Sequence, residues 1–125
     1  MRDFAIHATH NPGELARITN ALSLAGVNIK SIAAMAIGRE GLVRIIPDDV
    51  ETARNALRDG NIRFEEHELV TVLLENRAGE VTGVAAKLAE NGLNLDACYV
   101  VGLDGDLVEL ALAVDDVKKA KKILQ

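Results

Sequence analysis

The chain has 125 residues, of which 49% are hydrophobic and 26% are charged, and its net charge is −5. This composition is typical of a globular protein. The negative charge, with two phenylalanines, one tyrosine and no tryptophan, argues against a nucleic-acid partner, because nucleic acids bind basic surfaces and stack on aromatic rings. The longest apolar runs, residues 32–37 and 97–103, are too short to cross a bilayer, so no membrane partner is expected.

The N-terminal segment predicts a strand followed by an amphipathic helix. Residues 4–8 alternate weakly, as a half-buried strand does. Asn11 can cap the helix, Pro12 suits its first position, and Glu14 can complete a capping box. Gly26 fits the left-handed residue that ends a helix.

The rest of the first half predicts two strands, a second helix and a final strand. Residues 27–37 and 42–46 form the strands around a hairpin turn at 38–41. Asp48 or Asp49 caps the second helix, which Gly60 ends. Residues 62–66 form the last strand, so the order is strand, helix, strand, strand, helix, strand.

The second half repeats this order without its last strand. Strands are predicted at residues 69–74, 93–103 and 107–114, and helices along the stripes Val81, Val84, Leu88 and Val117, Ala120, Leu124. The missing strand would leave an exposed sheet edge, which proteins normally cover. We therefore expect that residues 62–66 lie between the copies, or that the open edge meets another subunit.

Both halves carry the same special positions. Gly13 and Glu14 match Gly79 and Glu80, which lie 66 positions later (79 − 13). A period this long indicates a duplicated domain, and we predict units at residues 1–67 and 68–125. Units of this size are marginal alone, and residues 32–37 are apolar on both strand faces. A homo-oligomer, most simply a dimer, is therefore expected.

Other reactive side chains give no catalytic or metal-binding pattern. Cys98 is the only cysteine and is expected to be a small buried hydrophobe in a reducing, cytoplasmic protein. His7, His10 and His67 lack a metal-ligand spacing. The sequence therefore predicts no metal, no cofactor and no enzyme activity.

The motif Asn-Pro-Gly-Glu-Leu at residues 11–15, followed by a helix that ends in Ala-Gly-Val-Asn-Ile at residues 25–29, resembles the ACT domain. The resemblance covers the whole chain as two ACT repeats. It implies an α+β fold of two ferredoxin-like βαββαβ repeats, with antiparallel sheets and helices on one face. The last strand of the second repeat is missing from the pattern.

The resemblance also implies where an amino acid binds: between the glycine turn of one unit and the second-strand start of its neighbour. In this chain the implied ligand-binding residues are His10, Asn11, Pro12, Gly13, Glu14, Leu15, Asn28 and Ile29 in the first copy, and Asn76, Ala78, Gly79, Glu80, Val81, Asn94 and Leu95 in the second. ACT domains often have an acidic residue where this chain has His10 and Asn76, and a proline where it has Ala78.

These residue types suit a free amino acid. Helix N-termini offer N–H donors to a carboxylate, and a glycine lets a ligand approach the backbone. Asn28 and Asn94 carry both a donor and an acceptor. The same residues could instead be only turn residues.

Three functions follow from this pattern. The leading prediction is a regulatory protein that senses a free amino acid at interfaces between ACT units. The second is an assembly module for a metabolic enzyme that needs no ligand. The third, an acylphosphatase-like enzyme, is disfavoured because Asn11 and Arg77 lie in different copies and neither loop holds the full catalytic set.

Overall fold

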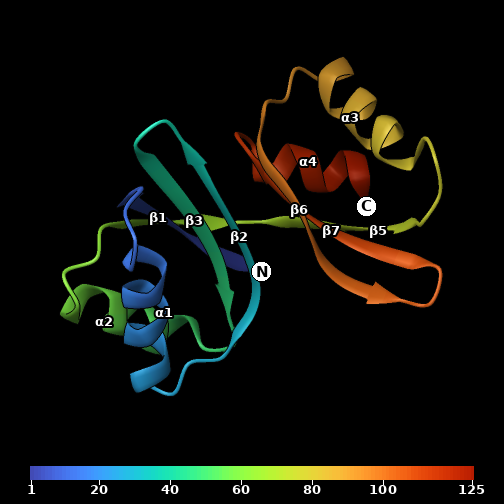
Figure 1. Cartoon of the computed structure of the whole chain (residues 1–125). Helices are drawn as coiled ribbons and strands as arrows, with labels where there is room; N and C mark the ends of the chain where they lie inside the picture. The colour runs from blue at the N-terminus through green and yellow to red at the C-terminus, as the bar shows by residue number, and fades with distance from the viewer. The chain divides into compact units, whose positions relative to one another are not determined.

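The computed structural model describes all residues from Met1 to Gln125 and divides the chain into two compact units (Figure 1). One unit is Arg2–His67, and the other comprises Glu68–Gln125 together with Met1. Only Leu69 separates the last strand of the first unit from the first strand of the second. None of the four helices has the length and hydrophobicity that crossing a membrane requires.

The first unit is a four-stranded sheet with two helices on one face. Its elements are β1 (Arg2–Thr9), α1 (Glu14–Leu24), β2 (Ile29–Ile37), β3 (Glu40–Pro47), α2 (Val50–Asp59) and β4 (Phe64–Glu68). The strand order is β2-β3-β1-β4, and β3 is antiparallel to both β1 and β2. Ile18 and Leu22 of α1 pack with Leu57 of α2 against Phe4 and Ile45 of the sheet. This is the ferredoxin-like arrangement that the sequence predicts.

The second unit repeats this arrangement with one strand fewer. Its elements are β5 (Val70–Glu75), α3 (Glu80–Glu90), β6 (Leu95–Asp104), β7 (Leu107–Val114) and α4 (Val117–Leu124). The antiparallel sheet has the order β5-β7-β6, and Val84, Leu88 and Ala120 of the helices pack against it. The prediction of an α+β fold that lacks the last strand of the second repeat is confirmed.

Both α1 and α3 end at the predicted glycine. Gly26 has φ 77° and Gly92 has φ 69°, values that a glycine adopts without a steric clash. The N–H of the following residue, Val27 or Leu93, turns back to the carbonyl of Leu22 or Leu88. Val27 and Leu93 therefore terminate helices and fill the core, and the prediction that they begin strands is wrong.

A buried ion pair lies on the sheet face opposite the helices of the first unit. Side chains alternate along β1, so Phe4 points to the helical core and Asp3 to the other face. Asp3 is fully buried, and its Oδ2 accepts a hydrogen bond from Arg44 Nε at 2.7 Å. His67 Nδ1 lies 3.3 Å from Arg44 Nη2. These three residues thus join β1, β3 and β4 across the sheet.

The structure corrects one prediction about Cys98, which is exposed on β6 and not a core residue. β6 is an edge strand of the second sheet, so one side of the strand has no neighbour within the unit. Partial burial still raises the pKa of the Cys98 thiol.

Asp49 caps α2 and is expected to make the first unit more sensitive to acid. The Asp49 carboxylate accepts hydrogen bonds from the side chain and the backbone N–H of Thr52, which lower its pKa below the usual 3.8. A lowered folded-state pKa gives stability that is present above the unfolded pKa and is lost as the pH falls through the folded value. Asp49→Asn keeps a capping oxygen but does not titrate. Its urea midpoint should therefore fall less than that of the unmodified protein between pH 7 and pH 3; an equal fall would contradict this assignment.

Candidate functional site

The first predicted turn lies between β1 and α1 and presents an uncapped helix. Gly13, with φ 92°, is the N-cap residue of α1, and no side chain accepts a hydrogen bond from the first turn of the helix. The Asn11 amide instead donates to Thr9 Oγ1 at 2.9 Å, and the Asn11 carbonyl accepts from Glu14 N–H. The Glu14 carboxylate pairs with Arg17 Nε at 3.2 Å. The predicted Asn11 cap, Pro12 as first helical residue and Glu14 capping box are therefore wrong.

The second turn repeats this geometry almost unchanged. Gly79 has φ 90° and is the uncapped N-cap residue of α3. Asn76 N–H bonds to the Asp106 carbonyl at 2.7 Å, as His10 N–H bonds to the Arg39 carbonyl at 2.8 Å. The turn carries Ala78 in place of Pro12, and the sequence difference does not alter the backbone at the glycine.

The other two helices are capped, and this contrast sets the glycine turns apart. Asp49 accepts from Thr52 N–H at the start of α2, and Asp116 accepts from Lys119 N–H at the start of α4. A helix without such a cap keeps unpaired N–H donors and a partial positive charge at its first turn. Only the two helices at the predicted sites thus offer these groups to an anion.

A crevice lies beneath each glycine turn. In the first unit it has a volume of about 380 Å³, and its lining includes His10, Asn11, Gly13, Glu14 and Leu15. In the second unit it has a volume of about 290 Å³, and its lining includes Asn76, Glu80 and Val81. The structure therefore brings all the predicted turn residues of the first copy except Pro12 to one crevice, whereas Ala78 and Gly79 of the second copy do not line theirs.

The crevice walls explain the difference in volume. Small residues of the first copy line the crevice where larger ones stand at matching positions of the second: Ala8 and Leu74, Ala34 and Val100, Gly41 and Val108. Leu15 and Val81 cover the two crevices and are 45% and 57% exposed. The walls are apolar in both units, and the polar groups gather at the turn.

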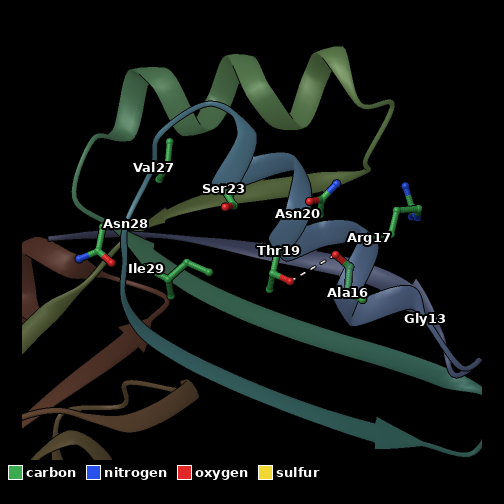
Figure 2. Close-up of a pocket in the computed structure, with 9 residues that line it drawn as sticks. All are labelled: Gly13, Ala16, Arg17, Thr19, Asn20, Ser23, Val27, Asn28 and Ile29. Carbon is green, nitrogen blue, oxygen red and sulfur yellow. Dashed lines mark hydrogen bonds between the residues drawn. The ribbon is translucent and has the colours of Figure 1, made fainter.

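The predicted second-strand residues lie at the far end of α1 from the glycine turn. Figure 2 shows an open groove along this helix, with Gly13 at one end and Asn28 at the other. The 11 residues of α1 span about 16 Å at 1.5 Å per residue, farther than one amino acid reaches. The structure therefore does not bring Gly13 together with Asn28 and Ile29 of the same unit, nor Gly79 with Asn94 and Leu95 across the equally long α3.

Asp48 and Asp115 fix the second-strand starts, and the sequence reading missed this role. The N–H of Asn28 donates to Asp48 Oδ1 at 3.0 Å, and the N–H of Asn94 donates to Asp115 Oδ1 at 3.1 Å. The Asn94 amide also donates to Asp115 Oδ2 at 3.3 Å, whereas the Asn28 side chain has no partner within the chain. The sequence feature that could have indicated this role is the Asp-Asp pair that is repeated before α2 and α4. The second aspartate of each pair caps the helix, which leaves the first to hold the strand start.

Polar side chains line the groove of the first copy only. Figure 2 shows Arg17, Thr19, Asn20 and Ser23 along α1, where the sequence reading singled out none of them. The matching positions on α3 hold small residues: Gly83, Ala85, Ala86 and Ala89. The repeat aligns α1 with α3 residue by residue, so the sequence alone already shows that the polar residues of α1 correspond to small residues of α3.

Comparison with known proteins gives a match at the level of the fold. No protein-family model matches the chain, and no curated protein matches it. Protein BT0572 from Bacteroides thetaiotaomicron superposes with a TM-score of 0.86 at 19% identity, over 98% of this chain and 85% of the other. The regulatory subunit of aspartate kinase from Thermus thermophilus superposes with a TM-score of 0.68 at 16% identity, over 98% and 87%. The alpha and beta subunits of aspartokinase give a TM-score of 0.68 at 15% identity, over 98% and 88%.

These structures support the resemblance that the two motifs indicate. They are similar over nearly the whole chain, with both copies included. The chain therefore has the fold of the tandem ACT-domain proteins.

Proposed function

We propose that this protein is a non-catalytic regulator that senses a free amino acid at interfaces between ACT units, with residues 1–67 and 68–125 as the two repeats. The observation that carries the proposal is the pair of uncapped, glycine-initiated helices at the repeated turns, beside two helices that aspartates cap. A regulatory role fits two of the similar structures, which are regulatory subunits of aspartate kinase.

The α-carboxylate of the ligand would bind the first turn of α1. The N–H groups there lack a side-chain cap, and the positive end of the helix dipole favours an anion. Gly13 leaves open space where another residue has a Cβ, since no atom lies within 4 Å of that position. The backbone N–H groups of Gly13 and Leu15 can therefore approach a carboxylate closely, whereas the Glu14 N–H donates to the Asn11 carbonyl.

The ammonium group would bind the amide oxygen of Asn28 from a neighbouring unit. Asn28 is exposed, and its side chain makes no hydrogen bond within its own unit. Because α1 separates it from Gly13 of the same unit, one amino acid contacts both residues only when two units assemble. Binding would then stabilise the assembly, which is the physical basis of the proposed regulation.

The ligand side chain would enter the crevice beneath the turn. In the first unit Leu15, Ala34 and Ala36 supply apolar walls. The one carboxylate in the lining of this crevice, Glu14, pairs with Arg17. An uncharged side chain is therefore favoured, and the roomier first crevice would take the larger ligand.

The proposal predicts that Gly13→Ala abolishes ligand binding while Gly26→Ala preserves it. Both glycines have positive φ and open space around the added Cβ, so both substitutions should cost about 1–2 kcal/mol of stability. Only Gly13 lies at the proposed carboxylate site; Gly26 lies at the other end of α1. Each of the twenty amino acids is added singly to the unmodified chain, and its thermal unfolding and sedimentation are followed. The amino acid that shifts both is then titrated against the two variants by calorimetry.

Two results would contradict the proposal. One is that no amino acid at millimolar concentration shifts either measurement; the ligand-independent assembly module would then be the better account. The other is that Gly13→Ala and Gly26→Ala bind the active amino acid equally well.

A further inference from the structure

The strand residues beneath each glycine turn form the floor of its crevice, and the floor of the first unit is nearly bare. Gly41 of β3 pairs in register with Ala8 of β1 on one side and with Ala36 of β2 on the other. Ala8 packs against the helical core, so this row lies on the sheet face that the helices cover. All three residues line the crevice. The row presents only the methyl groups of the two alanines, which leaves room for a ligand side chain.

Large side chains occupy the same row in the second unit. Val108 of β7 pairs in register with Leu74 of β5 and with Leu103 of β6, and all three residues line the second crevice. Leu74 and Val108 also pack against the helical core. Because a protein interior is close-packed, these side chains cannot move aside for a ligand without a loss of stability. The floor of the second crevice therefore leaves less room beneath the turn.

The rims of the two crevices also differ, but the rim does not set the size limit. Arg77 Nη1 lies 2.8 Å from Glu75 Oε2, and Arg77 Nε lies 3.5 Å from Glu80 Oε1. The corresponding contact in the first turn is uncharged, since the Asn11 amide donates to Thr9 Oγ1. The Arg77 side chain is 68% exposed, and exposed ion pairs contribute only about 0–1 kcal/mol. A ligand can therefore displace the rim contacts of the second crevice more easily than the side chains of its floor.

We propose that the two crevices bind amino acids of different size. The first takes a bulky apolar side chain, such as that of leucine or phenylalanine, and the second takes only a short side chain, such as that of alanine. This inference rests on the proposed amino-acid site and assigns its selectivity. Gly41 and Ala8 determine the size limit of the first crevice, and Val108 and Leu74 determine that of the second. One misplaced methylene in an apolar pocket changes affinity by about 10–200-fold, so a valine in place of a glycine separates the two classes of ligand.

The first test is Gly41→Val, which gives the first crevice the residue that the second has at the matching position. A Cβ at Gly41 would lie 3.4 Å from the Ala8 carbonyl oxygen and 3.8 Å from the Ala8 Cβ, which is ordinary van der Waals contact. Valine also favours strands, so the variant should fold, and urea unfolding checks this. In calorimetric titrations with leucine, phenylalanine and alanine, the affinity for the bulky amino acid should fall about tenfold or more. Alanine binding at the second crevice should stay unchanged.

The second test is Leu103→Ala, which makes the opposite change in the second crevice and is the reciprocal control. Leu103 is 75% exposed, so its truncation should leave the fold intact. The unmodified chain should bind the bulky amino acid at a single site. Leu103→Ala should keep that site unchanged and gain a second, weaker site for the same amino acid, because its floor then resembles that of the first unit.

Three results would overturn the selectivity and leave the amino-acid site in place. Folded Gly41→Val could bind the bulky amino acid as tightly as the unmodified chain does. The unmodified chain could bind it equally well at both turns, or could bind only amino acids with charged side chains. Failure of every amino acid to bind the unmodified chain would instead overturn the proposed site, and this inference with it.

Discussion

Phe4→Ala is expected to lower the free energy of unfolding of the first unit by about 3–5 kcal/mol, because it leaves a cavity in a closed core. Phe4 is fully buried, and its ring centroid lies 5.3 Å from that of Phe64 in an edge-to-face arrangement. This contact joins β1 to the start of β4. A small domain has only about 5–15 kcal/mol of stability in total, so the loss should be a large part of it.

The measurement is urea unfolding followed by circular dichroism at constant temperature. Leu24→Ala is the matched control, since Leu24 is 81% exposed and its truncation should change stability by less than about 0.5 kcal/mol. A loss below about 1 kcal/mol for Phe4→Ala would show that the core relaxes around the cavity, or that Phe4 lies elsewhere.

Asp3→Ala is expected to destabilise the first unit by about 3–5 kcal/mol, through charge and not through volume. Arg44 is only 8% exposed and donates to both carboxylate oxygens of Asp3, at 2.7 and 3.4 Å. Removal of Asp3 leaves a buried guanidinium without this carboxylate. Removal of both charges, in Asp3→Ala with Arg44→Met, should destabilise less than the sum of the two single substitutions.

A double-mutant cycle measures this coupling from the unfolding free energies of the four proteins. We expect a favourable coupling free energy between Asp3 and Arg44 that is larger than the coupling of an exposed ion pair. Arg17 and Glu14 on the surface of α1 provide that comparison, at about 0–1 kcal/mol. Additive effects at Asp3 and Arg44 would mean that the pair contributes no specific stability.

The sequence predicts the elements well because each depends on local spacing. The stripes along α1 and α3 and the glycines that end them are visible in short windows of residues. The predicted strand starts at Val27 and Leu93 are wrong, because apolar character alone does not distinguish a residue that terminates a helix from a residue in a strand. The hydrogen bond from the Val27 N–H to the Leu22 carbonyl shows that Val27 terminates the helix. The spacing of apolar residues in the sequence does not reveal this bond.

The candidate site is harder to read because its chemistry depends on where backbone groups point. Asn11 is a favourable capping residue, yet the left-handed Gly13 places the helix start two residues later, and the Asn11 amide turns to Thr9. Asp48 and Asp49 look equivalent in sequence, and only the fold assigns one to Asn28 and the other to Thr52. Which residues contact a ligand stays a prediction.

The joining of two copies in one polypeptide has an evolutionary consequence. In a homodimer of single ACT units every substitution would appear in both halves. Here one helix carries Arg17 while its counterpart carries Gly83, so each half has been free to drift by itself. If both glycine turns bind the effector, their affinities for it need not be equal. A titration would then show two binding steps at different effector concentrations. Together the two steps would cover a broader concentration range than two identical sites.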